Sequence, residues 1–353
     1  MSSARDRRRM IGVSFGPKTM AEALEGLPRI AAEADIAELR LDFFEEPYDL
    51  PRLLGERACP VVATLRPHDQ GGRSAYPASE RLKVLLRAAD LGAEYVDLEW
   101  DAASPPAVAA LKAAGAQVLV SRHDFTRMPD DFADGWWPDM LARGADVVKI
   151  VGMAGDVRDC LQVFRAFRRA DRPTVAIAMG EAGLPTRILA LREEQCFLTY
   201  ATLGSGARVA PGQLPVKELR EAYRVERLGP HTAVFGLLGP HVETARAAQY
   251  NAWFAEAGVD AVAVPFVADA YAPEIVSAFR ELPLAGWHVH GTELQETVGQ
   301  ALDEVAPSAC RKGKVNAVLA RRDGALIGEC VESPEEQFAL WTGRTANEWA
   351  AAG

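Results

Sequence analysis

Several features are scarce in this 353-residue sequence, and each absence excludes a class of protein. The five cysteines are scattered without metal-ligand spacing, which is typical of a reduced cytosolic compartment. No apolar run is long enough to span a bilayer. The polar, arginine-rich stretch Met1–Met10 precedes no apolar core, so we expect no signal peptide and a cytoplasmic location. With 39 basic against 49 acidic residues, the net charge of −10 argues against nucleic acid or an anionic membrane as a partner.

What is present is a regular alternation of strand and helix patterns. The composition, 49% hydrophobic and 25% charged, is that of a globular protein, and the length suffices for two domains. Helical segments such as Pro77–Gly92 separate eight short apolar runs. The runs are Met10–Phe15, Ile36–Asp42, Pro60–Arg66, Tyr95–Trp100, Gln117–Asp124, Val147–Gly152, Thr174–Gly180 and Phe197–Leu203. Eight strands alternating with helices predict an α/β fold of the (β/α)8 TIM barrel type.

A doubly wound parallel sheet is the alternative architecture. That sheet would favour a glycine-rich phosphate loop after the first strand, and none follows Phe15. Gly204-Ser205-Gly206 comes after the eighth run and lacks the third glycine, so we interpret it as a loop. In a barrel, function is expected where the strands end and the βα loops begin.

Lysine is also scarce, and one of the seven lysines stands out. Only Lys149 lies within an apolar, β-branched run, Ala145–Gly152, which predicts a strand buried on both faces. Burial disfavours the ammonium form, so we expect a lowered pKa and some free amine near neutral pH. A free amine attacks ketones and forms a Schiff base. The alternative is a lysine whose ammonium reaches solvent from a strand end.

Polar side chains gather at the other predicted strand ends. Alternation places Glu38, Arg40 and Asp42 on one face of their strand, which suits the mouth of a barrel. Taken singly, each residue has a simpler interpretation: an ion pair for Glu38 and Arg40, packing for His123, and surface positions for Arg66, His68 and Arg187. Together, a lysine, a histidine one strand earlier and several arginines suit Schiff-base chemistry on an anionic keto substrate.

At this point the sequence resembles type I 3-dehydroquinate dehydratase, the Schiff-base enzyme of the shikimate pathway. The matching motifs run in the family's order from about Met10 to Tyr223. They are Glu38-Leu39-Arg40-Leu41-Asp42, Ser121-Arg122-His123-Asp124-Phe125, Val147-Val148-Lys149-Ile150, Met179-Gly180 with Arg187, and Ala210-Pro211-Gly212-Gln213.

The resemblance implies a role for each of these residues. Lys149 would form an imine with the C3 ketone of 3-dehydroquinate, and His123 would remove the C2 proton and then protonate the departing C1 hydroxyl. Imine hydrolysis would release 3-dehydroshikimate. Arg187 would hold the substrate carboxylate. The substrate-binding set is completed by Glu38, Arg40, Arg66 and Gln213, with Gln70, Met179 and Val209 as accessory residues. Neither a cofactor nor a metal is implied.

Two positions depart from the family's pattern. Gln70 stands where the family usually has an acidic partner for the histidine, and Val209 where it often has a serine. Glutamine can orient an imidazole but cannot stabilise its cation by charge, so we expect a lowered pKa for His123. Asp69 is a candidate substitute. The valine removes a hydrogen bond to substrate.

The second half predicts a smaller α/β domain. Strands are expected at Val234–Gly239, Ala261–Phe266, Trp287–His290 and Lys314–Arg321, a hairpin turn at Arg322-Asp323-Gly324, and helices at about Glu243–Ala257, Pro273–Glu281 and Glu293–Glu304. The predicted organisation is a tail over residues 1–9, a barrel over 10–225, a linker over 226–232 and this domain over 233–353.

The second half resembles the substrate-binding domain of shikimate dehydrogenase, in a degenerate form. The resemblance rests on Val234–Gly239, Tyr250-Asn251-Ala252-Trp253-Phe254, Val264-Pro265-Phe266, Gly313-Lys314-Val315-Asn316-Ala317, Gly328 and the tail Gln337–Gly343. Only Glu332–Glu336 stands where that family inserts its nucleotide-binding domain, too few residues for a βαβ unit. Thr292-Glu293-Leu294 replaces the motif that carries the catalytic lysine.

Three readings follow from these resemblances. The first is a dehydratase with a non-redox second domain, which takes a small-molecule substrate and could form a homodimer. The second is a regulatory or metabolite-binding pseudoenzyme, impaired by Gln70 and Val209. The third, a bifunctional dehydratase–dehydrogenase, conflicts with the missing nucleotide domain. His288 and His290 alternate on one strand face, but no third ligand for a metal is evident.

Overall fold

The computed structural model describes residues 9–204, 212–282 and 284–343. The chain folds into two compact units. The first holds the chain as far as Gly155 together with Gln162–Arg220, and the second holds Asp156–Leu161 and the chain from Glu221 onward. The domain boundaries given above stay predictions.

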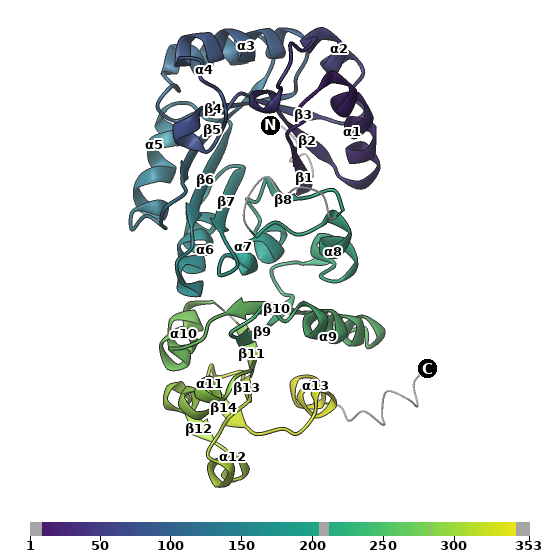
Figure 1. The fold of residues 1–353 in the computed structure, drawn as a ribbon. Helices are drawn as coiled ribbons and strands as arrows, with labels where there is room; N and C mark the ends of the chain where they lie inside the picture. Colours follow the sequence, from purple (N-terminus) through teal and green to yellow (C-terminus); the bar gives the residue numbers. More distant parts are fainter. Residues whose placement is uncertain (1–8, 205–211, 283, 344–353) are drawn as a thin grey trace, which may run out of the picture. The chain divides into compact units, whose positions relative to one another are not determined.

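The first unit is a parallel β-barrel with helices around it, as the sequence predicts (Figure 1). Its strands are β1 (Met10–Phe15), β2 (Ile36–Arg40), β3 (Val61–Thr64), β4 (Tyr95–Glu99), β5 (Gln117–Asp124), β6 (Val147–Met153), β7 (Thr174–Met179) and β8 (Leu198–Ala201). In the described residues the sheet order is β7-β6-β5-β4-β3-β2-β1-β8. Thr174 joins the two ends, because its N–H donates to Gln195 O and its carbonyl accepts from Phe197 N, both at 2.8 Å. This closure decides against a doubly wound sheet.

Helices follow the strands of the barrel. They are α1 (Met20–Glu33), α2 (Leu50–Gly55), α3 (Ala78–Asp90), α4 (Pro105–Ala113), α5 (Trp137–Ala142), α6 (Cys160–Arg169), α7 (Leu184–Leu189) and α8 (Val216–Glu221). Local sequence explains where several begin. Thr19 caps α1 by accepting from Glu22 N, and Ser104 caps α4 ahead of Pro105, a residue favoured in the first helical turn.

Along the barrel axis, the interior side chains form an apolar layer and, closer to the C-terminal ends of the strands, a charged layer. Val62, Leu119, Val147 and Val175 belong to the buried apolar cluster inside the sheet. The side chains that follow toward the strand ends, including Asp97 and Lys149, are buried and ionisable. The fold thus places a polar layer at the C-terminal ends of the strands, where barrels carry their functional groups.

The second unit is built on a mixed sheet in the order β10-β9-β11-β13-β14-β12. Its strands are β9 (Ala233–Gly239), β10 (Ala261–Val267), β11 (Leu284–Val289), β12 (Glu304–Val305), β13 (Ala317–Ala320) and β14 (Leu326–Glu329). Its helices are α9 (Thr244–Glu256), α10 (Ala272–Ala278), α11 (Thr292–Thr297), α12 (Pro307–Lys312) and α13 (Pro334–Thr342). The hairpin predicted at Arg322–Gly324 is present, because β13 pairs antiparallel with β14.

One predicted helix is shorter than its periodicity suggests. The helix expected over Glu293–Glu304 ends as α11 and a 3-10 turn at Ala301, and Glu304 lies in β12. Tertiary pairing explains the break: Asp303 N donates to Leu326 O at 3.0 Å, and Leu326 N donates to Asp303 Oδ2 at 2.7 Å. The short elements β12 and α12 were not predicted from the sequence.

A side chain of α9 satisfies the free backbone hydrogen-bonding groups at the middle of the edge strand β10. Asn251, 1% exposed, donates from Nδ2 to Ala263 O at 3.1 Å and accepts from Ala263 N at 2.7 Å. Pro265, two residues along on the same side of the strand, has no N–H to offer. An edge strand is a template for pairing with another chain, and these residues block it.

None of the helices in the described ranges is both long and apolar enough to cross a membrane.

Candidate active site

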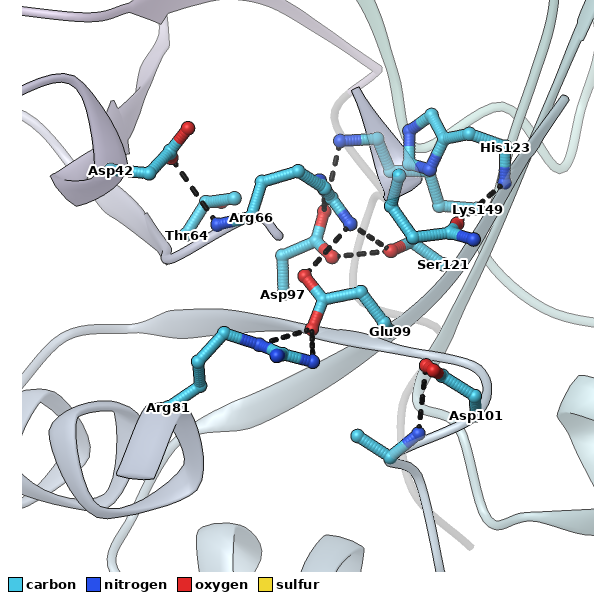
Figure 2. Close-up of polar contacts among 12 residues, drawn as sticks. Asp42, Thr64, Arg66, Arg81, Asp97, Glu99, Asp101, Ser121, His123 and Lys149 are labelled. Carbon is cyan, nitrogen blue, oxygen red and sulfur yellow. Dashed lines mark hydrogen bonds and ion pairs between the residues drawn. The ribbon is translucent and has the colours of Figure 1, made fainter. Parts of the chain in front are cut away.

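Lys149 lies at the centre of a buried polar network inside the barrel. Its Nζ donates to Glu38 Oε1 at 2.8 Å, to Asp97 Oδ2 at 2.9 Å and to the hydroxyl of Tyr200 at 3.1 Å. These partners come from β2, β4 and β8, so the network spans the barrel interior (Figure 2 shows its Asp97 side). Only 4% of Lys149 is exposed, which excludes a lysine that reaches solvent from a strand end.

The prediction of a lowered lysine pKa is wrong. Burial does act to lower it, but the carboxylates of Asp97 and Glu38 outweigh burial and raise the pKa of Lys149 above its usual value. Burial raises the pKa of Asp97, but Arg66 and Lys149 outweigh burial, and the pKa of Asp97 lies below its usual value. Lys149 is therefore an ammonium ion with two counter-ions, and the sequence did not reveal that Asp97 would lie beside it.

Arg66 extends the network along β4. Its guanidinium donates to Asp97 Oδ2 at 2.7 Å, to Glu99 Oε1 at 3.2 Å and to Ser121 Oγ at 2.6 Å (Figure 2). Glu99 also pairs with Arg81 of α3 at 3.3 Å. Burial raises the pKa of Glu99 to about 7, although Arg66 and Arg81 act in the opposite direction. Arg66 is only 2% exposed, so the simpler interpretation of Arg66 as a surface residue is wrong.

Asp42 holds Arg40 and the loop after β3 in place. Its carboxylate accepts from Arg40 Nε at 2.9 Å and Nη2 at 2.7 Å. It also accepts from the backbone N–H groups of Arg66 at 3.2 Å and Arg73 at 3.0 Å. The simple alternative of a Glu38–Arg40 ion pair is thus not what forms, because Arg40 binds Asp42 and Glu38 binds Lys149.

His123 is partly buried at the end of β5, beside this network. Its backbone N–H donates to Gln70 Oε1 at 3.2 Å, and its ring stacks on Phe125 with centroids 5.8 Å apart. Nδ1 is buried and has no hydrogen-bond partner among the described residues. Burial, with the cations of Arg66 and Lys149, holds the pKa of His123 well below its ordinary value. The direction matches the sequence-based expectation, but Gln70 orients the backbone and not the imidazole.

One pocket brings most of the predicted site residues together. Its lining includes Glu38, Arg40, Arg66, Gln70, His123, Lys149, Met179, Arg187 and Gln213. Arg187 is 1% exposed, and burial lowers its pKa to about 10. Val209 lies outside the described residues. His68 and Asp69 are exposed and do not belong to the lining.

Sequence reasoning missed several polar residues of the site. Asp97 and Glu99 alternate along β4 in the same way as Glu38 and Arg40 along β2, so the same pattern could have found them. Ser14 and Tyr200 also line the pocket, but single polar residues in apolar runs carry no such pattern.

The described residues contain no group of three or more side chains of the types that could hold a metal ion. His288 and His290 have ring centroids 4.1 Å apart, and His288 Nδ1 shares a hydrogen bond of 2.9 Å with the hydroxyl of Tyr250. His288 is therefore engaged in a hydrogen bond, and its ring packs on the ring of His290.

Comparison with known proteins identifies the family. The model of the type I 3-dehydroquinase family matches residues 11–230. The chain belongs to the type I 3-dehydroquinase family. Within it, the chain is 33% identical over 217 residues to the 3-dehydroquinate dehydratase of Methanopyrus kandleri, covering 60% of this chain and 97% of that one.

Similarity extends past the barrel in bifunctional relatives. The chloroplastic bifunctional 3-dehydroquinate dehydratase/shikimate dehydrogenase of Arabidopsis thaliana is 33% identical over 311 residues, which cover 85% of this chain and 51% of the relative. The chain thus spans about half the length of that protein. The structure of dehydroquinate dehydratase and shikimate dehydrogenase from S. pombe shares the fold, with a TM-score of 0.52 and 24% identity over 92% of this chain and 64% of the other. The second unit therefore resembles part of the bifunctional proteins.

Proposed function

We propose that the barrel is a 3-dehydroquinate dehydratase, which converts 3-dehydroquinate to 3-dehydroshikimate and water in the shikimate pathway. The observation that carries this proposal is Lys149, buried at the barrel mouth between Glu38 and Asp97, in the same pocket as His123 and Arg187. Membership of the type I 3-dehydroquinase family supports it.

The proposed chemistry begins with an imine between Lys149 Nζ and the C3 ketone. Its protonated form, the iminium, carries the same positive charge as the ammonium, so Glu38 and Asp97 remain as counter-ions. The iminium withdraws electrons and acidifies the proton at C2. Since preorganised charges act strongly in a buried site, the two carboxylates favour the iminium, which is the form that activates the substrate.

His123 is the proposed base for the C2 proton. Its lowered pKa keeps the imidazole neutral near neutral pH, which is the form that accepts a proton. The imidazolium then protonates the C1 hydroxyl as it leaves, and hydrolysis of the imine frees the product and Lys149. The unpartnered Nδ1 leaves the ring available to the substrate.

The remaining pocket residues are proposed to bind the substrate. Arg187 suits the carboxylate, because a guanidinium pairs with a planar anion through two hydrogen bonds. Arg40, Arg66, Glu38 and Gln213 line the same pocket, which supports the proposal that they contact ring hydroxyls. We propose no catalytic role for the second unit, and a cytoplasmic location and a homodimer belong to the same proposal.

The alternative is a metabolite-binding pseudoenzyme, favoured by Gln70 and Val209 at positions where the family has other residues. Ultraviolet absorbance of the enone product decides between the two. We expect the signal to grow with wild-type protein and 3-dehydroquinate and to be absent with Lys149→Ala. A folded wild-type protein that gives no signal and traps no imine with borohydride would favour the pseudoenzyme.

A further inference from the structure

Tyr200 brings a hydroxyl to the lysine that the proposed function uses as its nucleophile. The side chain comes from β8, is 4% exposed and lines the same pocket. Its oxygen accepts a hydrogen bond from Lys149 Nζ at 3.1 Å, and Nζ lies 4.7 Å from the centre of its ring. Burial raises the pKa of Tyr200, and Glu38 acts in the same direction, so the group is a phenol and not a phenolate.

The three acceptors around Lys149 are not equivalent. An ammonium has three N–H bonds, and here one is directed to Glu38, one to Asp97 and one to Tyr200. The two carboxylates can only accept, whereas a phenol can accept and donate at once. Within the described ranges no group accepts the proton of Tyr200, so this proton is available to a ligand in the pocket.

Imine formation requires a fixed number of proton transfers from the lysine nitrogen to the ketone oxygen. An ammonium and a ketone give an iminium and water, with the charge of +1 unchanged. The N–C bond forms, the C–O bond breaks, and the nitrogen goes from three N–H bonds to one. The two protons that it loses leave with the carbonyl oxygen as water. Both protons must therefore move from Lys149 Nζ to an oxygen that is attached to the same carbon.

We propose that Tyr200 relays these protons from Lys149 to the C3 oxygen of the substrate. Its oxygen accepts a proton from Nζ while its own proton passes to the substrate oxygen, once as the carbinolamine forms and once as it loses water. The two transfers are concerted, because burial disfavours a free phenolate. Glu38 and Asp97 stay ionised as counter-ions. The relay rests on the proposed function, and His123 keeps its role at C2 and C1.

Tyr200→Phe tests the relay, because it keeps the ring beside Nζ and removes only the hydroxyl. Borohydride reduces the iminium to a stable amine, so trapping at successive times, read by intact mass, measures imine formation separately from turnover. We expect imine formation to slow about 100-fold, the scale of an acid–base group, and its solvent deuterium isotope effect to shrink. The matched control is Tyr95→Phe, at the start of β4, whose ring packs on Phe197 at 5.0 Å. It should match wild type.

The outcomes separate the relay from the function. If Tyr200→Phe traps imine at the wild-type rate, the relay is wrong and the dehydratase stands. If wild-type protein traps no imine at all, the proposed function itself is wrong. Should Tyr200→Phe fail to fold, the dependence of wild-type imine formation on the deuterium fraction of the solvent decides: a curved dependence, from two protons that move in one step, supports the relay, and a linear one overturns it.

Discussion

Asp97 is the residue that two buried cations share. Its carboxylate accepts from Arg66 at 2.7 Å and from Lys149 at 2.9 Å, and it accepts from Ser121 at 2.5 Å. A buried ion pair contributes little net stability, but the removal of one partner leaves the other charge uncompensated. The charge state of Lys149 is therefore decided by the carboxylates of other strands, Asp97 and Glu38, which outweigh the effect of its own burial.

Asp97→Asn should destabilise the protein by about 3–5 kcal/mol at neutral pH, because Arg66 and Lys149 lose their shared counter-ion. The lowered pKa of Asp97 means that its contribution is present above the unfolded-state value of about 3.9 and is lost as pH falls through the lower folded-state value. The stability difference from wild type should thus be constant above about pH 5 and shrink in stronger acid. Urea unfolding at several pH values measures it.

Asp101→Asn is the control for this change. Asp101 follows β4 and is exposed, and among the residues that the structure describes its carboxylate accepts only from Ala102 N, at 3.0 Å. Surface changes of this kind alter stability by less than about 0.5 kcal/mol. If the two variants lose equal stability, the network around Asp97 has no special role.

The pH dependence of activity tests His123. The imidazole must be neutral to accept the C2 proton, so activity should persist below the ordinary histidine value of about 6.5, because the pKa of His123 is lowered. Gln70→Glu adds a carboxylate beside His123 N, which favours the imidazolium and raises that pKa. We expect the acid limb of kcat/KM to move to higher pH.

His68→Glu supplies the control, since it adds the same charge at an exposed position of the same loop. Its acid limb should stay near the wild-type position. A Gln70→Glu limb that does not move would show that burial and the neighbouring cations alone set the pKa of His123.

For single residues, the sequence predicted which side chains line the same pocket but not how they shift one another's pKa values. The strand-end pattern and the family motifs indicated Lys149, His123, Arg187 and Gln213, and these line one pocket. The protonation of Lys149 was predicted with the wrong sign, because burial is visible in a sequence while the carboxylates that oppose it come from other strands.

At the scale of elements, the edge of the second sheet depends on one side chain. Asn251 supplies a donor and an acceptor to Ala263 of β10, as a neighbouring strand would. Asn251→Ala leaves a buried N–H and a buried C=O without partners, at a cost of about 1–3 kcal/mol for each group. We expect lower stability in urea and faster amide exchange at Ala263.

Gln249→Ala, on the same helix α9, is the comparison. Gln249 is half-buried, and its side chain accepts from Arg246 of the same helix at 3.2 Å. Amide exchange at Ala263 should be unchanged in this variant. Equal exchange in the two variants would mean that β10 is protected by its burial and not by Asn251.

The strands of the barrel were predictable because each is a short apolar run bounded by turn residues. All eight coincide with the expected runs to within a few residues. Prediction failed where long-range pairing decides the structure. The helix expected to reach Glu304 gives way to β12 because Asp303 pairs with Leu326 of the hairpin. Helical periodicity is a local pattern, so it carries no information on a pairing partner that lies more than twenty residues further along the chain.

On the scale of the whole molecule, the two units carry unequal chemistry. The barrel holds a buried network of ionisable groups. In the part of the second unit that the structure describes, the buried polar residues include Asn251, His288 and Gln337 but no lysine or carboxylate. Burial, with a contribution from His290, lowers the pKa of His288 to about 3, so this histidine stays neutral.

The short connection in the second unit leads to the last prediction. Between β14 and α13 lie only Cys330, Val331, Glu332 and Ser333, and a parallel crossover needs about a dozen residues or more. No nucleotide-binding βαβ unit can be formed there, so the chain should neither bind NADPH nor use it to reduce 3-dehydroshikimate. Absorbance of the reduced nicotinamide, followed with purified protein and 3-dehydroshikimate, should stay constant, and NADPH should not raise the melting temperature. A shikimate dehydrogenase added to the same cuvette is the positive control. Oxidation that requires both protein and 3-dehydroshikimate before that addition would mean that the second unit builds a redox site by other means than a nucleotide-binding domain.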